Sequence, residues 1–141
     1  RELSLLVSDL GLLSRVFFVG NVSEEEKSVY LTHCALLVLP SVMKNEAFGL
    51  VQLEAMSYGK PVVSTNLGTG VELVNIHERT GLIVPPKDSS ALAKAISFLL
   101  DNPATAQKYG KFAQRRVRTE FSSEIMTERF FTIYQSLVRK K

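Results

Sequence analysis

Short apolar runs that alternate with amphipathic stretches constrain this chain more than any other feature. The runs cover residues 16–19, 36–39, 61–64 and 82–84, and helical signals follow each of them. Strands that are apolar on both faces and alternate with helices are typical of βαβ units around a buried parallel sheet. We therefore predict an α/β fold, with a doubly wound, Rossmann-like parallel sheet.

Helix boundary signals lie between and after the runs. Ser23 followed by Glu26 is a capping-box pattern that begins a helix running to about His33. Apolar residues at helical spacing predict a helix over residues 47–58, which Gly59 is expected to end. Further helices are expected just past residue 70 and over about residues 89–100, 104–119 and 123–138. The C-terminal end is therefore predicted to be entirely helical.

Size and composition fit one ordinary domain. The 141 residues are 45% hydrophobic and 22% charged, with a net charge of +3 that suits an anionic ligand without requiring one. Cys34 is the single cysteine, and its apolar neighbours indicate a small buried core residue. With no signal peptide and no apolar stretch near the ~20 residues that cross a bilayer, we expect a reduced, cytoplasmic location. Because the first residue is Arg1, we expect a piece of a longer protein.

The loop after the second apolar run carries the strongest chemical signal. Gly49 stands at the mouth of the predicted helix, where backbone N–H groups and the helix dipole favour an anion such as phosphate. Glu46 lies before the helix and Glu54 inside it, on the order of 12 Å apart along the backbone at ~1.5 Å per residue. Glycosidase carboxylate pairs stand only ~5–9.5 Å apart.

The two carboxylates therefore fit the two ends of one long ligand with an anionic middle, as in a nucleoside-diphosphate sugar. The plainer alternative makes Glu46 a helix-start carboxylate and Glu54 a surface residue. Against this alternative, Glu54 lies in a helix with few polar residues, so we expect it to be partly buried and to have a partner.

Residues 46–63 resemble the E-x7-E signature of retaining GT-B glycosyltransferases, specifically family 4. The block reads Glu-Ala-Phe-Gly-Leu-Val-Gln-Leu-Glu, continued by Ala-Met-Ser-Tyr-Gly-Lys-Pro-Val-Val. Segments at residues 18–23, 80–86, 120–123 and 133–137 also resemble that family, so the likeness covers essentially the whole chain. The resemblance implies that residues 1–141 are part of the C-terminal, donor-binding half of a GT-B fold, without the N-terminal acceptor domain.

The resemblance also implies roles for individual residues. Glu46 would be the catalytic carboxylate, which binds sugar hydroxyls and stabilises charge near the anomeric carbon. The backbone at Phe48, Gly49 and Leu50 would contact the sugar and the diphosphate, and Glu54 would hold the ribose hydroxyls. The donor would be a UDP- or GDP-sugar bound without a metal or other cofactor, for hexose transfer to a glycan, glycolipid or lipid-linked acceptor.

The resemblance further implies an arginine and a lysine that bind the diphosphate, and we expect these to come earlier in the domain than the first residue of this chain. Neither Arg15 nor Lys44 matches that motif. With the acceptor domain also absent, we expect the isolated chain to be inactive. A non-catalytic nucleotide-sugar-binding module, or an epimerase or phosphorylase on the same fold, stays open as an alternative.

Four further features have modest interpretations. The Gly68-Thr69-Gly70 loop follows the third run and could line the sugar or phosphate site, although it is not a dinucleotide fingerprint. His33 and His77 are isolated, and we expect structural or surface roles and no metal site. A solvated basic face is expected on the penultimate helix, with attraction to an anionic membrane as the alternative and nucleic acid disfavoured. Its residues are Lys108, Lys111, Arg115, Arg116 and Arg118. The apolar pattern of the last helix, from Ile125 to Leu137, is interpreted as core packing.

Overall fold

The computed structural model describes residues 2–138 and divides the chain into two compact units, Arg1–Tyr30 and Leu31–Lys141. In the first unit, α1 (Glu2–Asp9) buries Val7. The helix α2 (Glu24–His33) begins in this unit and buries Leu31 near its end. The predicted capping box is present, because the Glu26 N–H donates to Ser23 Oγ (3.2 Å) and the Ser23 N–H donates to Glu26 Oε2 (2.9 Å).

The strand predicted over residues 16–19 is wrong. These residues have no strand assignment, and all four side chains are exposed, Phe17 at 77%. A run of β-branched and aromatic residues favours extended backbone, but a strand exists only where a neighbouring strand supplies hydrogen bonds. Among residues 2–138 the segment has no such neighbour.

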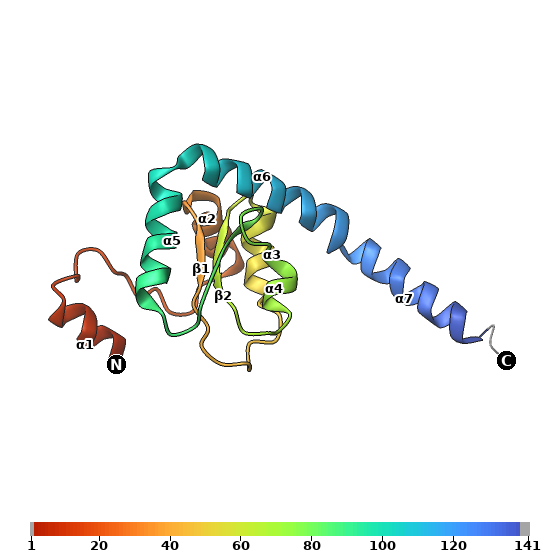
Figure 1. The fold of residues 1–141 in the computed structure, drawn as a ribbon, viewed down its shortest axis with the longest axis horizontal. Helices are drawn as coiled ribbons and strands as arrows, with labels where there is room; N and C mark the ends of the chain where they lie inside the picture. The colour runs from red at the N-terminus through yellow and green to blue at the C-terminus, as the bar shows by residue number, and fades with distance from the viewer. Residues whose placement is uncertain (1, 139–141) are drawn as a thin grey trace. The chain divides into compact units, whose positions relative to one another are not determined.

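The second unit is built on a three-stranded parallel sheet in the order β1-β2-β3 (Figure 1). The strands are β1 (Leu37–Leu39), β2 (Val62–Thr65) and β3 (Gly81–Val84), in register from Leu37 opposite Val62 and from Val62 opposite Gly81. The helices that follow them are α3 (Leu50–Ser57), α4 (Val71–Val74), α5 (Ser89–Asp101), α6 (Pro103–Glu120) and α7 (Ser123–Val138). These strands and helices confirm the predicted α/β fold and its helical C-terminal end.

Two apolar clusters cover the two faces of the sheet. Val62 packs with Ala55 of α3 and Val74 of α4, whereas its neighbour Val63 packs with Leu99 of α5 on the opposite face. In Figure 1, α5 accordingly lies on one side of β2 while α3 and α4 lie on the other. Because both faces are covered by helices, the central strand β2 is fully buried and the sheet is doubly wound.

The last helix does not pack in the core. None of the described residues of α7 is buried, and Phe130 and Tyr134 are 54% and 64% exposed. The interpretation of its apolar pattern as core packing is therefore wrong, because the layers of the sheet are already closed by α3, α5 and α6. Part of α7 instead lines an open hollow of about 360 Å³ beside Phe48 and Leu53. No helix among the described residues is long and apolar enough to cross a membrane.

Candidate functional site

The candidate site lies at the carboxyl end of β1, where the chain turns into α3. Helix α3 begins at Leu50, three residues later than predicted, because Gly49 adopts a left-handed conformation with φ 70° and ψ 59°. Glycine reaches this conformation without the strain that a Cβ would bring. The loop therefore ends in a sharp turn that places Glu46, Phe48 and Gly49 directly before the first helical turn.

The Glu46 carboxylate folds back onto the mouth of the helix. Its Oε1 accepts a hydrogen bond from the Gly49 N–H at 3.0 Å, and the residue is half-buried. Such a bond satisfies one backbone donor of the turn and fixes the direction of the carboxylate. The helix-start carboxylate proposed as the plainer alternative is therefore present, and it is compatible with a role toward a ligand because a carboxylate has further acceptor sites.

Gln52 was missed by sequence reasoning, yet it holds this turn in place. Its side chain is fully buried, and Nε2 donates to the Phe48 carbonyl (3.2 Å) and the Val71 carbonyl (3.3 Å). The amide therefore ties α3 to α4 beneath Gly49, while its Oε1 is buried with no partner among the described residues. The available signal was an amide between two apolar residues, Val51 and Leu53, inside a mostly apolar helix.

The glycine-containing loop after β2 lies against the Glu46 turn. Thr69 Oγ1 donates to the Glu46 carbonyl (3.0 Å), and the Gly70 N–H donates to the Ala47 carbonyl (2.8 Å). A Cβ on Gly70 would come within 2.6 Å of that same carbonyl, so the close approach requires glycine. The structure thus brings together two loops that are more than twenty residues apart in the sequence.

Glu72 fixes the other half of the same loop. Its Oε1 accepts hydrogen bonds from the Leu67 N–H (2.5 Å) and the Gly68 N–H (2.6 Å). The two amides are thereby used inside the protein and are not available to a ligand. Nearby, Lys44 Nζ lies 4.0 Å from the position that a Cβ on Gly68 would occupy. Lys44 does not match the family's basic motif, but it does place a positive charge beside this loop.

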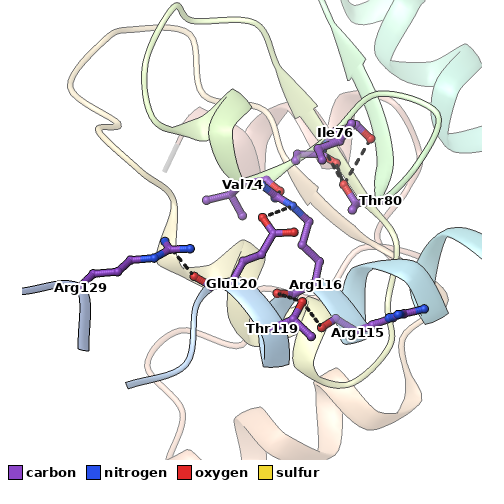
Figure 2. Close-up of polar contacts among 9 residues, drawn as sticks. Val74, Ile76, Thr80, Arg115, Arg116, Thr119, Glu120 and Arg129 are labelled. Carbon is purple, nitrogen blue, oxygen red and sulfur yellow. Dashed lines mark hydrogen bonds and ion pairs between the residues drawn. The ribbon is translucent and has the colours of Figure 1, made fainter. Parts of the chain in front are cut away.

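Phe48 is supported from the side by an aromatic and cationic stack. Its ring meets Phe121 edge to face, with centroids 6.1 Å apart, and the Arg116 guanidinium lies 4.8 Å from the Phe121 centroid. As Figure 2 shows, Arg116 points inward, donates to the Val74 carbonyl, and pairs with Glu120 at 3.1 Å. Arg116 is only 7% exposed, so its assignment to a solvated basic face is wrong.

Leu50 is the first residue of α3, and Glu54 lies about one turn further along the helix. Glu54 is the fifth residue of this helix and is half-buried, as predicted, and it is not without an interaction partner. Leu50 is 66% exposed, so its side chain contributes little to the core and its backbone N–H belongs to the open first turn. Glu46, the Gly49 turn and Glu54 thus follow one another along a single loop and helix.

A second hollow, of about 220 Å³, opens at the carboxyl ends of the strands, where the Glu46 loop also begins. Residues from all three strand ends line it, namely Pro40 after β1, Thr65 at the end of β2, and Pro85 and Asp88 after β3. In parallel α/β sheets this edge, at the carboxyl ends of the strands, is where ligands bind. Thr65 Oγ1 donates to the Ser41 carbonyl and so links the end of β2 to the loop that follows β1.

Metal-binding residues do not gather anywhere in the described part of the chain, where no group of three His, Cys, Asp or Glu side chains is placed to hold an ion. His33 is exposed, and His77 uses Nδ1 to accept a hydrogen bond from the Ile83 N–H at 2.9 Å. The expected surface and structural roles of the two histidines are confirmed.

A parallel sheet covered on both faces by helices defines the class of doubly wound, Rossmann-like α/β domains, in which ligands bind at the carboxyl ends of the strands. Residues 1–116 match the family model described as glycosyl transferases group 1, and the chain belongs to that family. The predicted resemblance to a glycosyltransferase family is thereby confirmed.

Curated relatives agree with this membership. The chain is 33% identical over 129 residues to the O-antigen chain mannosyltransferase C of Escherichia coli, covering 92% of this chain and 35% of the relative. It is 39% identical over 122 residues to the D-rhamnosyltransferase WbpZ of Pseudomonas aeruginosa, covering 86% and 32%. The chain therefore spans about a third of the length of these relatives.

Solved structures show the same fold. A sucrose-phosphate synthase from Thermosynechococcus elongatus superposes with a TM-score of 0.88 and 38% identity, over 100% of this chain and 35% of that protein. Anabaena HepE in complex with UDP-glucose superposes with a TM-score of 0.85 and 27% identity, over 96% and 36%. The fold is that of a GT-B glycosyltransferase domain.

Proposed function

We propose that this chain binds the nucleoside-diphosphate sugar donor of a retaining, family 4-like glycosyltransferase. The observation that carries the proposal is the continuous arrangement of Glu46, the Gly49 turn and Glu54 along one loop and helix. A donor has the matching order of groups, with sugar hydroxyls, diphosphate and ribose hydroxyls along its length. Support also comes from HepE, a structural neighbour whose structure was solved in complex with UDP-glucose.

The diphosphate would lie at the N-terminus of α3. The first-turn N–H groups of a helix have no acceptor within the helix, and the dipole adds partial positive charge there. The Gly49 N–H is already paired with Glu46, so the donors for the phosphates would be those of Leu50 and the residue after it. Lys44 would add a positive charge close by. We propose that binding needs no metal, because these groups supply the charge complement.

Glu46 would act on the transferred sugar. Its bond to the Gly49 N–H holds the carboxylate beside the phosphate end of the donor and leaves other lone pairs for sugar hydroxyls. A fixed negative charge near the anomeric carbon would stabilise positive charge that develops there as the bond to the phosphate breaks. Glu54, further along α3, would accept hydrogen bonds from the ribose hydroxyls.

The acceptor is proposed to be a glycan, glycolipid or lipid-linked saccharide, and the reaction to take place at the cytoplasmic side of a membrane. Relatives named as mannosyltransferase and rhamnosyltransferase support a carbohydrate product. A non-catalytic binding module is the alternative, and turnover by the full-length protein decides between the two.

Calorimetric titration with UDP, GDP, UDP-glucose and GDP-mannose tests the role assignment. Glu54→Ala should weaken binding of free nucleotide and nucleotide sugar alike, by at least about tenfold for a charge-assisted hydrogen bond of ~1.5–3 kcal/mol. Glu46→Ala should weaken only the sugar-bearing ligand, and excess EDTA should change neither affinity. Glu128→Ala, on the exposed helix α7, is the matched control. Unchanged binding in both variants would show that the roles are wrong.

A further inference from the structure

A cluster of cationic side chains lies beside α6, away from the loop that carries Glu46. A hollow of about 490 Å³ opens between α6 and the turn that precedes β3. We call it the α6 hollow, and its principal lining residues are Glu78, Arg79, Lys108, Lys111, Phe112 and Arg115. It therefore gathers four cations and one carboxylate around a single concavity.

The cations come from two separate elements. Lys108, Lys111 and Arg115 follow one another at spacings of three and four residues, which places them on one face of α6. Arg79 reaches the same hollow from the turn between α4 and β3. Within residues 2–138, no carboxylate pairs with any of these four side chains, so their charges are not compensated inside the protein.

Arg79 is held in position before any ligand arrives. Its guanidinium carbon lies 4.3 Å from the centroid of the Phe112 ring. Stacking on an aromatic face restricts the side chain while leaving the N–H groups at its edge free to bind oxygen. A planar fork of donors beside two ammonium groups is an arrangement suited to the oxygens of a phosphate group.

The other charged group at the rim is Glu78, whose carboxylate lies 4.0 Å from His77 Nε2. It faces an imidazole outside the set of four cations and is 72% exposed, so it offsets little of their charge. Figure 2 shows Arg115 extending away from its buried neighbour Arg116. The side chains of α6 that line the α6 hollow are thus distinct from Arg116, which makes buried contacts.

The α6 hollow is also separate from the proposed donor site. Arg79 comes two residues before β3 begins, at the amino end of the strand, whereas Glu46 follows the carboxyl end of β1. In a parallel sheet, the amino ends and the carboxyl ends of the strands lie on opposite sides of the domain. One nucleotide sugar bound at the helix α3 mouth would not explain cations collected at the other edge.

We propose that the α6 hollow is a binding site for a phosphate group, supplied either by a free phosphate or by the headgroup of an anionic lipid. The guanidinium of Arg79 would bind two phosphate oxygens while Lys108, Lys111 and Arg115 neutralise the charge. If the source is a lipid, the site would hold the domain against an anionic membrane surface, because each basic residue near that surface adds to the attraction. This proposal does not depend on the donor-binding role.

The first arm of the test measures inorganic phosphate by NMR. The amide signals of Arg79, Lys111 and Phe112 should shift with added phosphate, separately from those of Gly49 and Leu50. Combining Arg79→Ala with Lys111→Ala should weaken this binding at least about tenfold, since two charge-assisted hydrogen bonds are removed. Lys94→Ala, an exposed lysine on α5, is the matched control and should leave it unchanged.

The second arm measures sedimentation with phosphatidylcholine vesicles, with and without phosphatidylglycerol. If a lipid is the source, the chain should bind only the vesicles that contain phosphatidylglycerol, and the double variant should lose that binding while Lys94→Ala retains it. Thermal unfolding of each variant checks that the fold is intact. Absence of binding in both arms, or equal losses in the control and double variants, would overturn the proposal.

Discussion

At the scale of single residues, Gly49 sets the geometry of the candidate site. Its positive φ turns the Glu46 loop into α3, and its N–H holds the Glu46 carboxylate. Its missing side chain is equally important, because a Cβ would lie 2.7 Å from Leu39 Cδ2 and 2.8 Å from Gln52 Nε2. Gln52 is buried and uses that nitrogen for two hydrogen bonds, so it cannot move aside without losing them.

We therefore expect Gly49→Ala to lower the free energy of unfolding by more than the ~1–3 kcal/mol that a left-handed alanine costs. Gly59→Ala is the matched control. Gly59 has nearly the same φ, 71°, but a Cβ there would meet no atom nearer than 3.8 Å, which is ordinary van der Waals contact. Urea unfolding of the two variants compares the costs. Equal losses would mean that the contact with Gln52 is unimportant.

Cys34 gives a prediction on pH. The residue is half-buried, less than the predicted core position. This burial raises the pKa of its thiol, the nearby Lys60 ammonium acts in the opposite direction with a smaller effect, and the thiol donates to the Leu31 carbonyl at 3.6 Å. In the folded chain it should react with iodoacetamide only at higher pH than in the urea-unfolded chain. It is the single cysteine, so the rate reports on it alone.

The sign for stability follows from the same shift. Below the thiol's ordinary pKa the group is neutral in both states, and the burial costs nothing electrostatically. As the pH rises through that value the unfolded chain loses its proton first, so the free energy of unfolding should fall. Identical reactivity profiles for the folded and unfolded chains would contradict this expectation.

At the scale of elements, a buried polar network joins α4 to the sheet. Asn75 Nδ2 lies 2.8 Å from Ser64 Oγ and 3.2 Å from both the Val62 and Leu82 carbonyls. Thr80 Oγ1 in turn donates to Asn75 Oδ1 at 2.8 Å. The amide therefore connects β2, β3 and the turn before β3 in a region with no solvent access.

Asn75→Ala should lower the free energy of unfolding by about 2 kcal/mol or more, because at least two buried groups lose a partner at ~1–3 kcal/mol each. Asn102→Ala removes an exposed hydrogen bond to the Phe98 carbonyl (2.8 Å) and should cost about 1 kcal/mol or less. Thermal or urea unfolding measures both. A small loss for Asn75→Ala would show that water or other side chains replace the amide.

Elements whose signals are local could be predicted from the sequence. The helix α2 follows from Ser23 and Glu26, and β2 follows from a short apolar run that is buried on both faces. Elements that depend on distant partners could not. Residues 16–19 have strand-forming side chains but no strand beside them, and α7 has an apolar pattern but no core left to enter.

The candidate site likewise has residues that the sequence predicts and contacts that it does not. Glu46, Gly49 and Glu54 are recognisable because they are close in the sequence and follow a known spacing. The contacts of Thr69 with Glu46 and of Gln52 with Val71 join residues about twenty positions apart, and only the folded chain brings them together. The first residue of α3 also differs from the prediction, because the left-handed Gly49 delays the start of this helix to Leu50.

At the scale of the whole molecule, two charged features lie at opposite ends of the strands of one sheet. The Glu46 turn lies at the carboxyl ends of the strands, and the α6 hollow lies at their amino ends. The chain spans about a third of the length of the curated relatives that it matches. The domain's own contribution, under the proposed function, is to hold the donor in a fixed orientation.

A crystal structure of the chain with a bound nucleoside-diphosphate sugar tests that contribution most directly. The account predicts diphosphate oxygens within hydrogen-bond distance of the Leu50 N–H at the start of α3. It also predicts sugar hydroxyls on the Glu46 carboxylate and ribose hydroxyls on Glu54. A donor bound elsewhere, for example with its phosphates on Arg79 and Lys111 and the Glu46 turn empty, would contradict the central claim.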